Sequence, residues 1–220
     1  MSYYAGGDIS CITPCPLPFA THHCSWGRVP YLFLWPNGTS SGGLKVAVDE
    51  LAYNFIVAGG GANGGAFDHD DGSSFYRGHH NFEVYGGFKS DFDGHGKQAH
   101  DNVQAYANVY GPKCLGISTL PHDAPNNYFA EGYYNNKCIL SVDSVPYLEM
   151  GSCDADSSIV NRMLLGSNSI YTPSASATVV CGKTYTFEQW MALGLDANTT
   201  ISTLPTADTI IGWARETLGM

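Results

Sequence analysis

The pattern of hydrophobic and polar positions changes twice along the chain. Residues 1–43 show no periodicity, whereas residues 44–180 carry short apolar runs separated by Gly-rich or Asn/Asp-rich turns. Helix-length amphipathic runs appear only in residues 181–220. The sequence therefore predicts an irregular, cysteine-containing N-terminal segment, a body of short strands and a short helical C-terminal cap.

Several of the short runs open on asparagine. The runs are YNFIVA, HNFEVY, DNVQAY, NNKCIL and SNSIYTP, with asparagines at Asn54, Asn81, Asn102, Asn136 and Asn168. A strand that recurs every 20 to 35 residues or so is typical of a solenoid. We expect these amides to stack and to satisfy the backbone of buried turns, which is a structural role.

Residues 67–87 and 88–108 repeat one pattern at an offset of 21, with Asp70 matching Asp91 and His79 matching His100. If each unit is one coil, matching residues lie about 4.8 Å apart along the axis. The repeat thus predicts that Asp70 stacks over Asp91, and a further step of 21 residues back adds Asp49 to the file. Because strand side chains alternate, Phe88 should point inward and Lys89 outward.

The C-terminal region predicts two helices. Thr186 and Gln189 have the spacing of a capping box, and Gly194 stands where a left-handed residue ends a helix. A second helix should begin near Thr206 and present one apolar face. Since an open solenoid end exposes strand edges, we expect both helices to cap that end.

The composition fits one globular domain with an acidic surface. Hydrophobic residues make up 44% of the 220 residues, and 20 Asp and Glu face only 10 Lys and Arg. That charge repels nucleic acid and favours neutral glycans, or acidic ones only with a divalent cation. The longest apolar run before residue 40, VPYLFLW, is too short to span a bilayer.

The cysteines and two glycosylation motifs indicate a secreted protein. No CxxC pair is present, so disulfides are favoured over zinc for the seven cysteines, which are Cys11, Cys15, Cys24, Cys114, Cys138, Cys153 and Cys181. Asn37 and Asn198 each begin an Asn-X-Thr motif. The first ten residues do not form a signal peptide, which predicts a secreted chain without its leader or a piece of a longer chain.

The amino-acid sequences of several segments resemble those of a known group of proteins. GGANGGAFDHDDGSSFYRGHHNFEVYGGFKSDFDGHGK, VYGPKCLG, AEGYYNNKCIL and STLPTADTIIGWARETLGM resemble secreted right-handed parallel β-helix proteins of microbial eukaryotes, over roughly residues 45 to 220. The resemblance implies an all-β, right-handed parallel β-helix, the pectin-lyase-like fold. That fold hosts lyases, hydrolases, adhesins and structural proteins, so the resemblance does not assign a catalytic residue.

The acidic cluster of the 21-residue repeat is the candidate site. Stacked carboxylates raise one another's pKa unless a cation or a shared proton relieves them, which suits either a calcium site or an acid–base pair. Candidate catalytic residues are Asp70, Asp91, Asp93, His95 and Arg77. Lys89, Tyr85 and Tyr106 are candidates for substrate binding. A calcium ion would take Asp68, Asp70 and Asp91.

These residues leave three functions open. The first is a carbohydrate-active protein that cleaves a polysaccharide as a glycoside hydrolase or a lyase. The second is glycan binding without turnover. The third is an extracellular structural element stabilised by calcium. A purely structural interpretation of the cluster also stands, because Asp-Gly and Asp-Asp-Gly are common turn formers.

Overall fold

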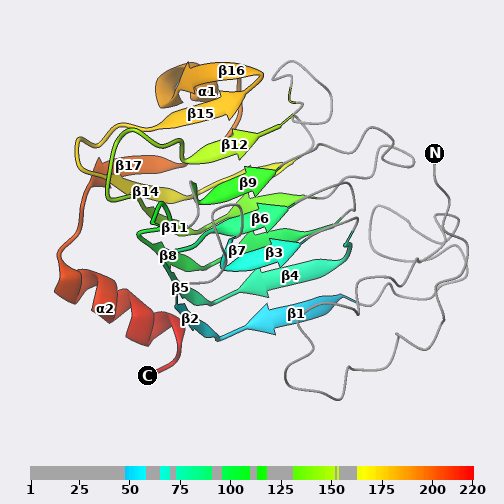
Figure 1. Ribbon diagram of the computed structural model, residues 1–220, viewed down its shortest axis with the longest axis vertical. Coiled ribbons are helices and arrows are strands. Elements are labelled where there is room, and N and C mark those ends of the chain that lie inside the picture. The colour runs from blue at the N-terminus through cyan, green and yellow to red at the C-terminus, as the bar shows by residue number, and fades with distance from the viewer. Residues whose placement is uncertain are drawn as a thin grey trace, which may run out of the picture.

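The computed structural model describes residues 48–57, 65–69, 73–90, 96–109, 113–117, 131–151, 153 and 163–220. The described chain forms a parallel β-solenoid in which successive strands pass in turn through three sheets (Figure 1). This confirms the predicted fold class; the irregular segment expected over residues 1–43 lies outside the described residues.

Each sheet takes every third strand, except that β16 follows β15 within the third sheet. The first sheet contains β1 (Asp49–Ala52), β4 (Tyr76–His79), β7 (Gln98–His100), β10 (Gly132–Tyr134) and β13 (Leu164–Gly166). The second contains β2 (Phe55–Val57), β5 (Phe82–Val84), β8 (Val103–Ala105), β11 (Lys137–Ile139), β14 (Ser169–Thr172) and β17 (Thr200–Thr203). The third contains β3 (Phe67–His69), β6 (Phe88–Ser90), β9 (Leu115–Ile117), β12 (Leu148–Met150), β15 (Thr178–Cys181) and β16 (Lys183–Thr186).

The strand register confirms the 21-residue repeat. Phe67 pairs with Phe88 in the third sheet, and His79 pairs with His100 in the first sheet. All neighbouring strands are parallel except β16, which runs antiparallel to β15. Phe88 is buried and Asp68 is exposed, as alternation along the strands predicts.

Asp49 does not belong to the file of Asp70 and Asp91. It lies in β1 of the first sheet and pairs with Tyr76, 27 positions later in the chain. The prediction of a third stacked carboxylate was wrong because the first coil is longer than the repeat that follows it. A constant step of 21 residues therefore does not hold at the N-terminal end of the solenoid.

The turn between the first and second sheets, which we call the first corner, has the same geometry in every coil. One residue there adopts a left-handed backbone with φ between 51° and 62°, at Tyr53, His80, Asp101, Asn135, Ser167 and Asn198. In all but the last coil the next residue is one of the predicted asparagines, and in the last coil it is Thr199. The left-handed residue makes the bend, and the side chain that follows points along the axis.

The asparagines form one continuous hydrogen-bonded ladder. The backbone N–H of Asn54 donates to Oδ1 of Asn81 at 2.9 Å, and the same contact recurs from Asn81 to Asn102 at 2.9 Å. From Asn81 onward, each Asn side-chain amide also donates to a backbone carbonyl of the preceding coil, as Asn102 does to Gly78, whereas the Asn54 amide donates to Ala52 in its own coil. The ladder continues through Asn136 to Asn168, and the N–H of Asn168 donates to the hydroxyl of Thr199. The expected structural role of the five asparagines is confirmed.

Two disulfides cross-link neighbouring coils inside the solenoid. Cys114 pairs with Cys138, and Cys153 pairs with Cys181, with Cα atoms 5.9 and 4.7 Å apart. These bonds confirm the disulfide interpretation for four cysteines, whereas Cys11, Cys15 and Cys24 lie outside the described residues. Loops of this length predict a stabilisation of about 3 to 4 kcal/mol for each bond.

One charged side chain lies deep in the core. Glu83 is fully buried on the inner face of the second sheet, where Gln104 donates a hydrogen bond of 3.0 Å to it. The hydroxyl of Tyr133 in turn donates to Gln104. Burial raises the pKa of Glu83 to about 8, so this carboxyl is protonated in the folded protein over much of the acidic and neutral range.

The two helices take different positions. In α1 (Phe187–Ala192) the capping box of Thr186 and Gln189 forms, and Phe187 and Trp190 are buried in the core at the C-terminal end of the solenoid. By contrast, α2 (Ala207–Thr217) lies against the outer face of the second sheet (Figure 1). Only α1 therefore caps the end, and the coils extend to Thr203 in β17, beyond the boundary expected at residue 180.

A break in the asparagine ladder should cost more in its middle than at its end. Replacing Asn102 with Ala leaves the buried N–H of Asn81 without its acceptor, so we expect the free energy of unfolding to fall by about 2 to 4 kcal/mol. Asn54→Ala is the matched control, since no described N–H donates to the Asn54 side chain, and should cost about 1 kcal/mol or less. Denaturant unfolding measures both, and equal losses would contradict the proposed importance of the ladder.

The buried carboxyl predicts a dependence of stability on pH. Between pH 4.5 and about 8 the folded state keeps a proton on Glu83 that the unfolded state releases, so its contribution to stability falls as pH rises through that window. Glu83→Gln removes this effect. The stability of the variant relative to wild type should rise by more than about 1 kcal/mol from pH 4.5 to 8.

Glu216→Gln, which alters an exposed carboxyl on α2, serves as the control and should give a constant difference over the same range. Thermal unfolding of all three proteins at several pH values provides the measurement. A Glu83→Gln difference that stays flat or falls with pH would show that the carboxyl is not protonated in the fold.

Candidate functional site

The predicted acidic residues follow the third-sheet strands, at the turn that leads to the first sheet. We call this turn the third corner. Asp70 directly follows β3 and Asp91 directly follows β6, two strands that pair in register. Asp70, Asp91, Asp93 and His95 themselves lie outside the described residues. The described residues next to them in the chain end β3 and β6 and lead into β4 and β7.

Asp68 and Lys89 form an ion pair on the outer face of the third sheet. They are direct partners in the register of β3 and β6, and the Lys89 ammonium lies 2.9 Å from the Asp68 carboxylate. Lys89, which the sequence offered as a candidate for substrate binding, thus neutralises one carboxylate of the predicted cluster. Such a partly exposed pair contributes little to stability, typically about 0 to 1 kcal/mol.

The same outer face carries a second ion pair further along the axis. Gly116 pairs with both Lys89 and Glu149 in the register, and it leaves a position without a side chain between them. A Cβ atom at Gly116 would lie only 2.9 Å from Cε of Lys113, so the lysine stem crosses the sheet at this point. Lys113 reaches Glu149 in this way and pairs with it. Each of these two carboxylates therefore has a lysine partner on this face, so the two pairs expose little net charge.

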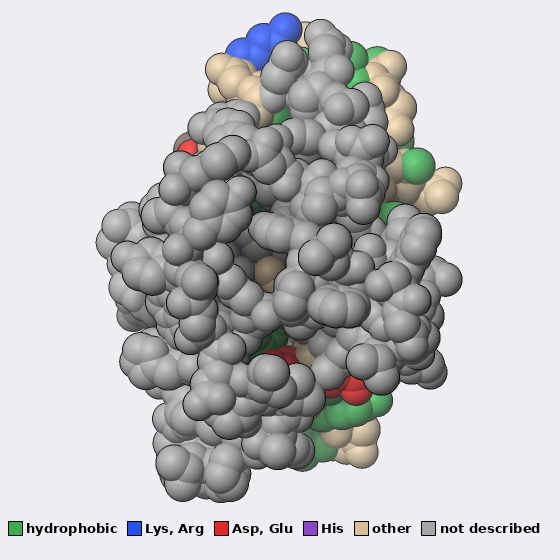
Figure 2. Space-filling model, turned by 90° about the vertical axis from the view of Figure 1, so that its right-hand side faces the viewer, with side chains coloured by type: hydrophobic (Ala, Val, Ile, Leu, Met, Phe, Trp, Pro, Cys, Tyr) green, Lys and Arg blue, Asp and Glu red, His purple; other side chains and the backbone are tan. Residues whose placement is uncertain are grey.

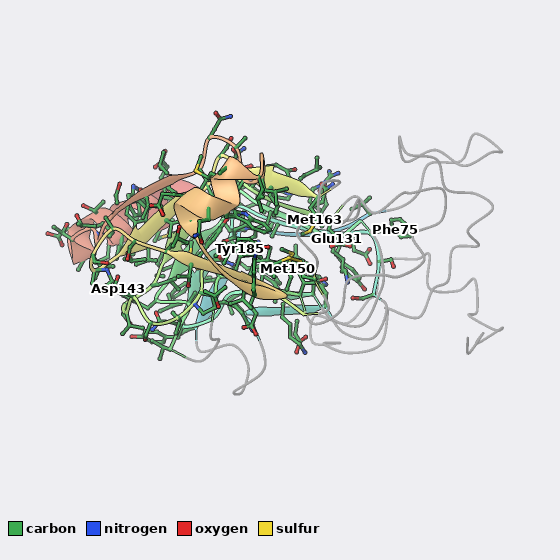
Figure 3. The ribbon with its side chains drawn as sticks, turned by 90° about the horizontal axis from the view of Figure 1, so that it is seen from above. Phe75, Glu131, Asp143, Met150, Met163 and Tyr185 are labelled. Atoms are coloured by element: carbon green, nitrogen blue, oxygen red, sulfur yellow. A yellow bond between two sulfur atoms is a disulfide. The ribbon has the colours of Figure 1, made fainter. Side chains whose placement is uncertain are left out.

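Three ionisable side chains are buried at the third corner. His69 ends β3, whereas Lys97 and Glu131 stand just before β7 and β10, and each is at most 5% exposed. The Lys97 backbone N–H donates to Glu131 at 3.4 Å. Figure 3 shows Glu131 at the opposite side of the solenoid from Asp143, which lies in the turn between the second and third sheets. Figure 2 looks onto the side of the third corner, where described acidic side chains reach the surface.

Burial shifts the pKa values of His69 and Glu131 strongly. Desolvation, with a smaller effect of the Lys97 charge, lowers the pKa of His69 to about 3, so its imidazole is neutral at pH 7. Desolvation raises the pKa of Glu131 to about 7, although the nearby Lys97 opposes that rise. Perturbed ionisable groups of this kind concentrate at functional sites.

Two polar atoms at this corner have no hydrogen-bond partner among the described residues. They are Nε2 of His69 and Oγ of Ser73, both buried. The His69 ring packs between Tyr76 and Phe88, at centroid distances of 4.7 and 4.9 Å. The sequence analysis missed this buried group, although strand alternation places His69 on the same inward face as Phe67.

The other predicted site residues lie in different parts of the solenoid. Arg77 is on the outer face of the first sheet, where it forms an ion pair of 3.4 Å with Glu50. Tyr85 and Tyr106 stack at the turn between the second and third sheets, with ring centroids 6.4 Å apart. The described structure therefore brings Asp68 and Lys89 together and places Arg77, Tyr85 and Tyr106 away from that pair.

The remaining predictions concern calcium, glycosylation and the membrane. No three His, Cys, Asp or Glu side chains among the described residues come together to hold a metal ion. Asn198 is exposed at the first corner, whereas Asn37 is outside the described residues. Over the part of the chain that the structure describes, no helix is long and apolar enough to cross a membrane.

Comparisons of the chain with protein-family models, with curated proteins and with solved structures gave no match.

Proposed function

We propose that this protein is an extracellular, carbohydrate-active β-solenoid that acts on a polysaccharide at the outer face of the third sheet and the third corner. The observation that carries the proposal is the register of β3 and β6, which sets two acidic segments directly after paired strands of adjacent coils. The two disulfides fit the oxidising environment of a secreted protein.

The charge pattern of the third sheet suits an uncharged or weakly charged polymer. Asp68 and Glu149 each have a lysine partner, so this face does not depend on a cation for neutrality. Parallel strands repeat their outward side chains along the solenoid axis, which provides similar contacts for successive units of a linear chain. The resemblance to secreted right-handed parallel β-helix proteins supports the same class of substrate.

The catalytic residues in this proposal are the aspartates after β3 and β6. In this proposal Asp70 and Asp91 divide the roles of acid and base or nucleophile, while Asp93 and His95 assist the proton transfer. Glu131, Lys97 and His69 are too buried to touch a polymer and act as positioning residues beneath that site. The buried Glu131 and Lys97 place ionisable groups directly before β10 and β7 in a region of low dielectric.

Asp70→Asn and Asp91→Asn should each lower cleavage of a responsive polysaccharide by at least about 100-fold, because a positioned acid or base contributes on that scale. The melting temperature should change by no more than a few degrees. The assay measures new reducing ends and the absorbance of unsaturated products over a panel of neutral and acidic polysaccharides, with and without calcium. Unsaturated products identify a lyase, and reducing ends alone identify a hydrolase.

Asp143→Asn is the matched control, because it alters an exposed aspartate on the opposite side of the solenoid and should leave cleavage unchanged (Figure 3). If the protein cleaves no polysaccharide but retains a labelled glycan, its function is glycan binding and not catalysis. If it neither cleaves nor retains a glycan, and its melting temperature falls when calcium is chelated, the structural alternative is favoured over the proposal.

A further inference from the structure

The outer face of the first sheet carries a ladder of stacked rings that the proposed function does not use. His79, His100 and Tyr134 are partners in the register of β4, β7 and β10. The His79 and His100 rings are 5.1 Å apart with planes 8° from parallel, and the His100 and Tyr134 rings are 4.9 Å apart with planes 6° from parallel. We call these three residues the ring ladder.

Stacking limits which atoms of the ring ladder a ligand can reach. Because the rings cover one another's faces along the axis, only their edges remain for a ligand, and the His100 side chain is 15% exposed. On both imidazoles, Nδ1 already has a partner. Nδ1 of His79 lies 2.9 Å from Nδ1 of His80, and Nδ1 of His100 lies 2.7 Å from the Asp101 carboxylate. The ring atoms left for a ligand are Nε2 of both histidines, which contact no hydrogen-bond partner among the described residues, and the Tyr134 hydroxyl.

The chemistry of these edges matches hydroxyl groups. Because Asp101 accepts the Nδ1 proton of His100, Nε2 of that ring is an acceptor when the imidazole is neutral and a donor when it is protonated. The tyrosine hydroxyl both donates and accepts. A sugar hydroxyl also does both, so it can pair with each position in either state of the imidazole.

The charges around the ring ladder disfavour an anionic ligand. Glu50 and Asp101 flank it, and the net charge of the chain is −10. Burial, together with the nearby His100, His80 and Arg77, holds the pKa of His79 below its ordinary value, which keeps that ring neutral at pH 7. Arg77 supplies donors for hydroxyl oxygens in the adjacent row, where it uses one N–H for Glu50.

We infer that the ring ladder is a second glycan-binding surface, which holds a neutral, extended polysaccharide parallel to the solenoid axis. The ring spacing is close to the length of one hexose in an extended chain, so successive sugars meet His79, His100 and Tyr134 in turn. The rings are already held in place by stacking and by their Nδ1 contacts, which lowers the cost of ordering them on binding. The inference shares the substrate class of the proposed function but uses a different face of the molecule.

The test measures binding of cellohexaose, mannohexaose, laminarihexaose and hexagalacturonate to the full chain by isothermal titration calorimetry. We expect at least one neutral hexasaccharide to bind, and the corresponding trisaccharide to bind more weakly. His100→Phe keeps a ring in the stack but removes its nitrogens, and Tyr134→Phe removes only the hydroxyl. Each variant should weaken binding by about 3- to 10-fold, the value of one hydrogen bond.

Tyr171→Phe is the matched control, because it removes a hydroxyl from a ring on the second sheet that packs against Trp213. It should leave binding unchanged. The ring variants are also measured in the Asp70→Asn background, which disables the proposed cleavage site and keeps a failure of that site separate from a failure of the ring ladder. Three results would overturn the inference: no binding of any neutral hexasaccharide, stronger binding of hexagalacturonate, or neutral binding that survives both ring variants. Binding lost only in Asp70→Asn would also overturn it and would locate the glycan on the third sheet.

Discussion

The asparagine ladder is the interaction on which the rest of the structure depends. At the first corner the chain turns through a left-handed residue, and the buried N–H that follows needs an acceptor that no strand supplies. An asparagine from the next coil provides it and donates its own amide to a carbonyl of the preceding coil. Every coil is therefore aligned at this corner, whatever its length elsewhere. This alignment sets the register of the strands in the first and second sheets.

This alignment explains why the sequence predicted the fold better than it predicted the site. The ladder asparagines are short polar residues at the start of apolar runs, so they can be recognised without knowing which coils touch. The coil length varies instead at the other two turns. A longer segment between β2 and β3 makes Asp49 pair with Tyr76 across 27 positions, and longer segments on both sides of β9 make Gln98 pair with Gly132 across 34. A file of carboxylates extrapolated at a constant step of 21 residues therefore failed at Asp49, although Asp68 and Lys89 do pair at that step.

The buried ionisable residues show a second limit of sequence reasoning. Lys97 and Glu131 stand before strands, in segments rich in polar residues, where a charged side chain is normally exposed. Both are buried in the fold, where the Lys97 backbone N–H donates to Glu131 from a neighbouring coil, and such a contact between coils cannot be read from the local pattern. Likewise, the period of α2 identified its apolar face, but periodicity does not show that this face packs on the second sheet rather than on the end of the solenoid.

The position of α2 changes how the molecule can come apart. In a simple solenoid each coil touches only its neighbours, so terminal coils can fray one at a time. Here Ile210 and Trp213, which follow the last coil, pack in one cluster with Phe82 from a coil near the N-terminal end. Because α2 contacts distant coils, unfolding of the C-terminal coil together with α2 also exposes apolar side chains of coils near the N-terminal end. The solenoid should therefore behave as one mechanical unit, with an unfolding transition more cooperative than its repetitive backbone alone would give.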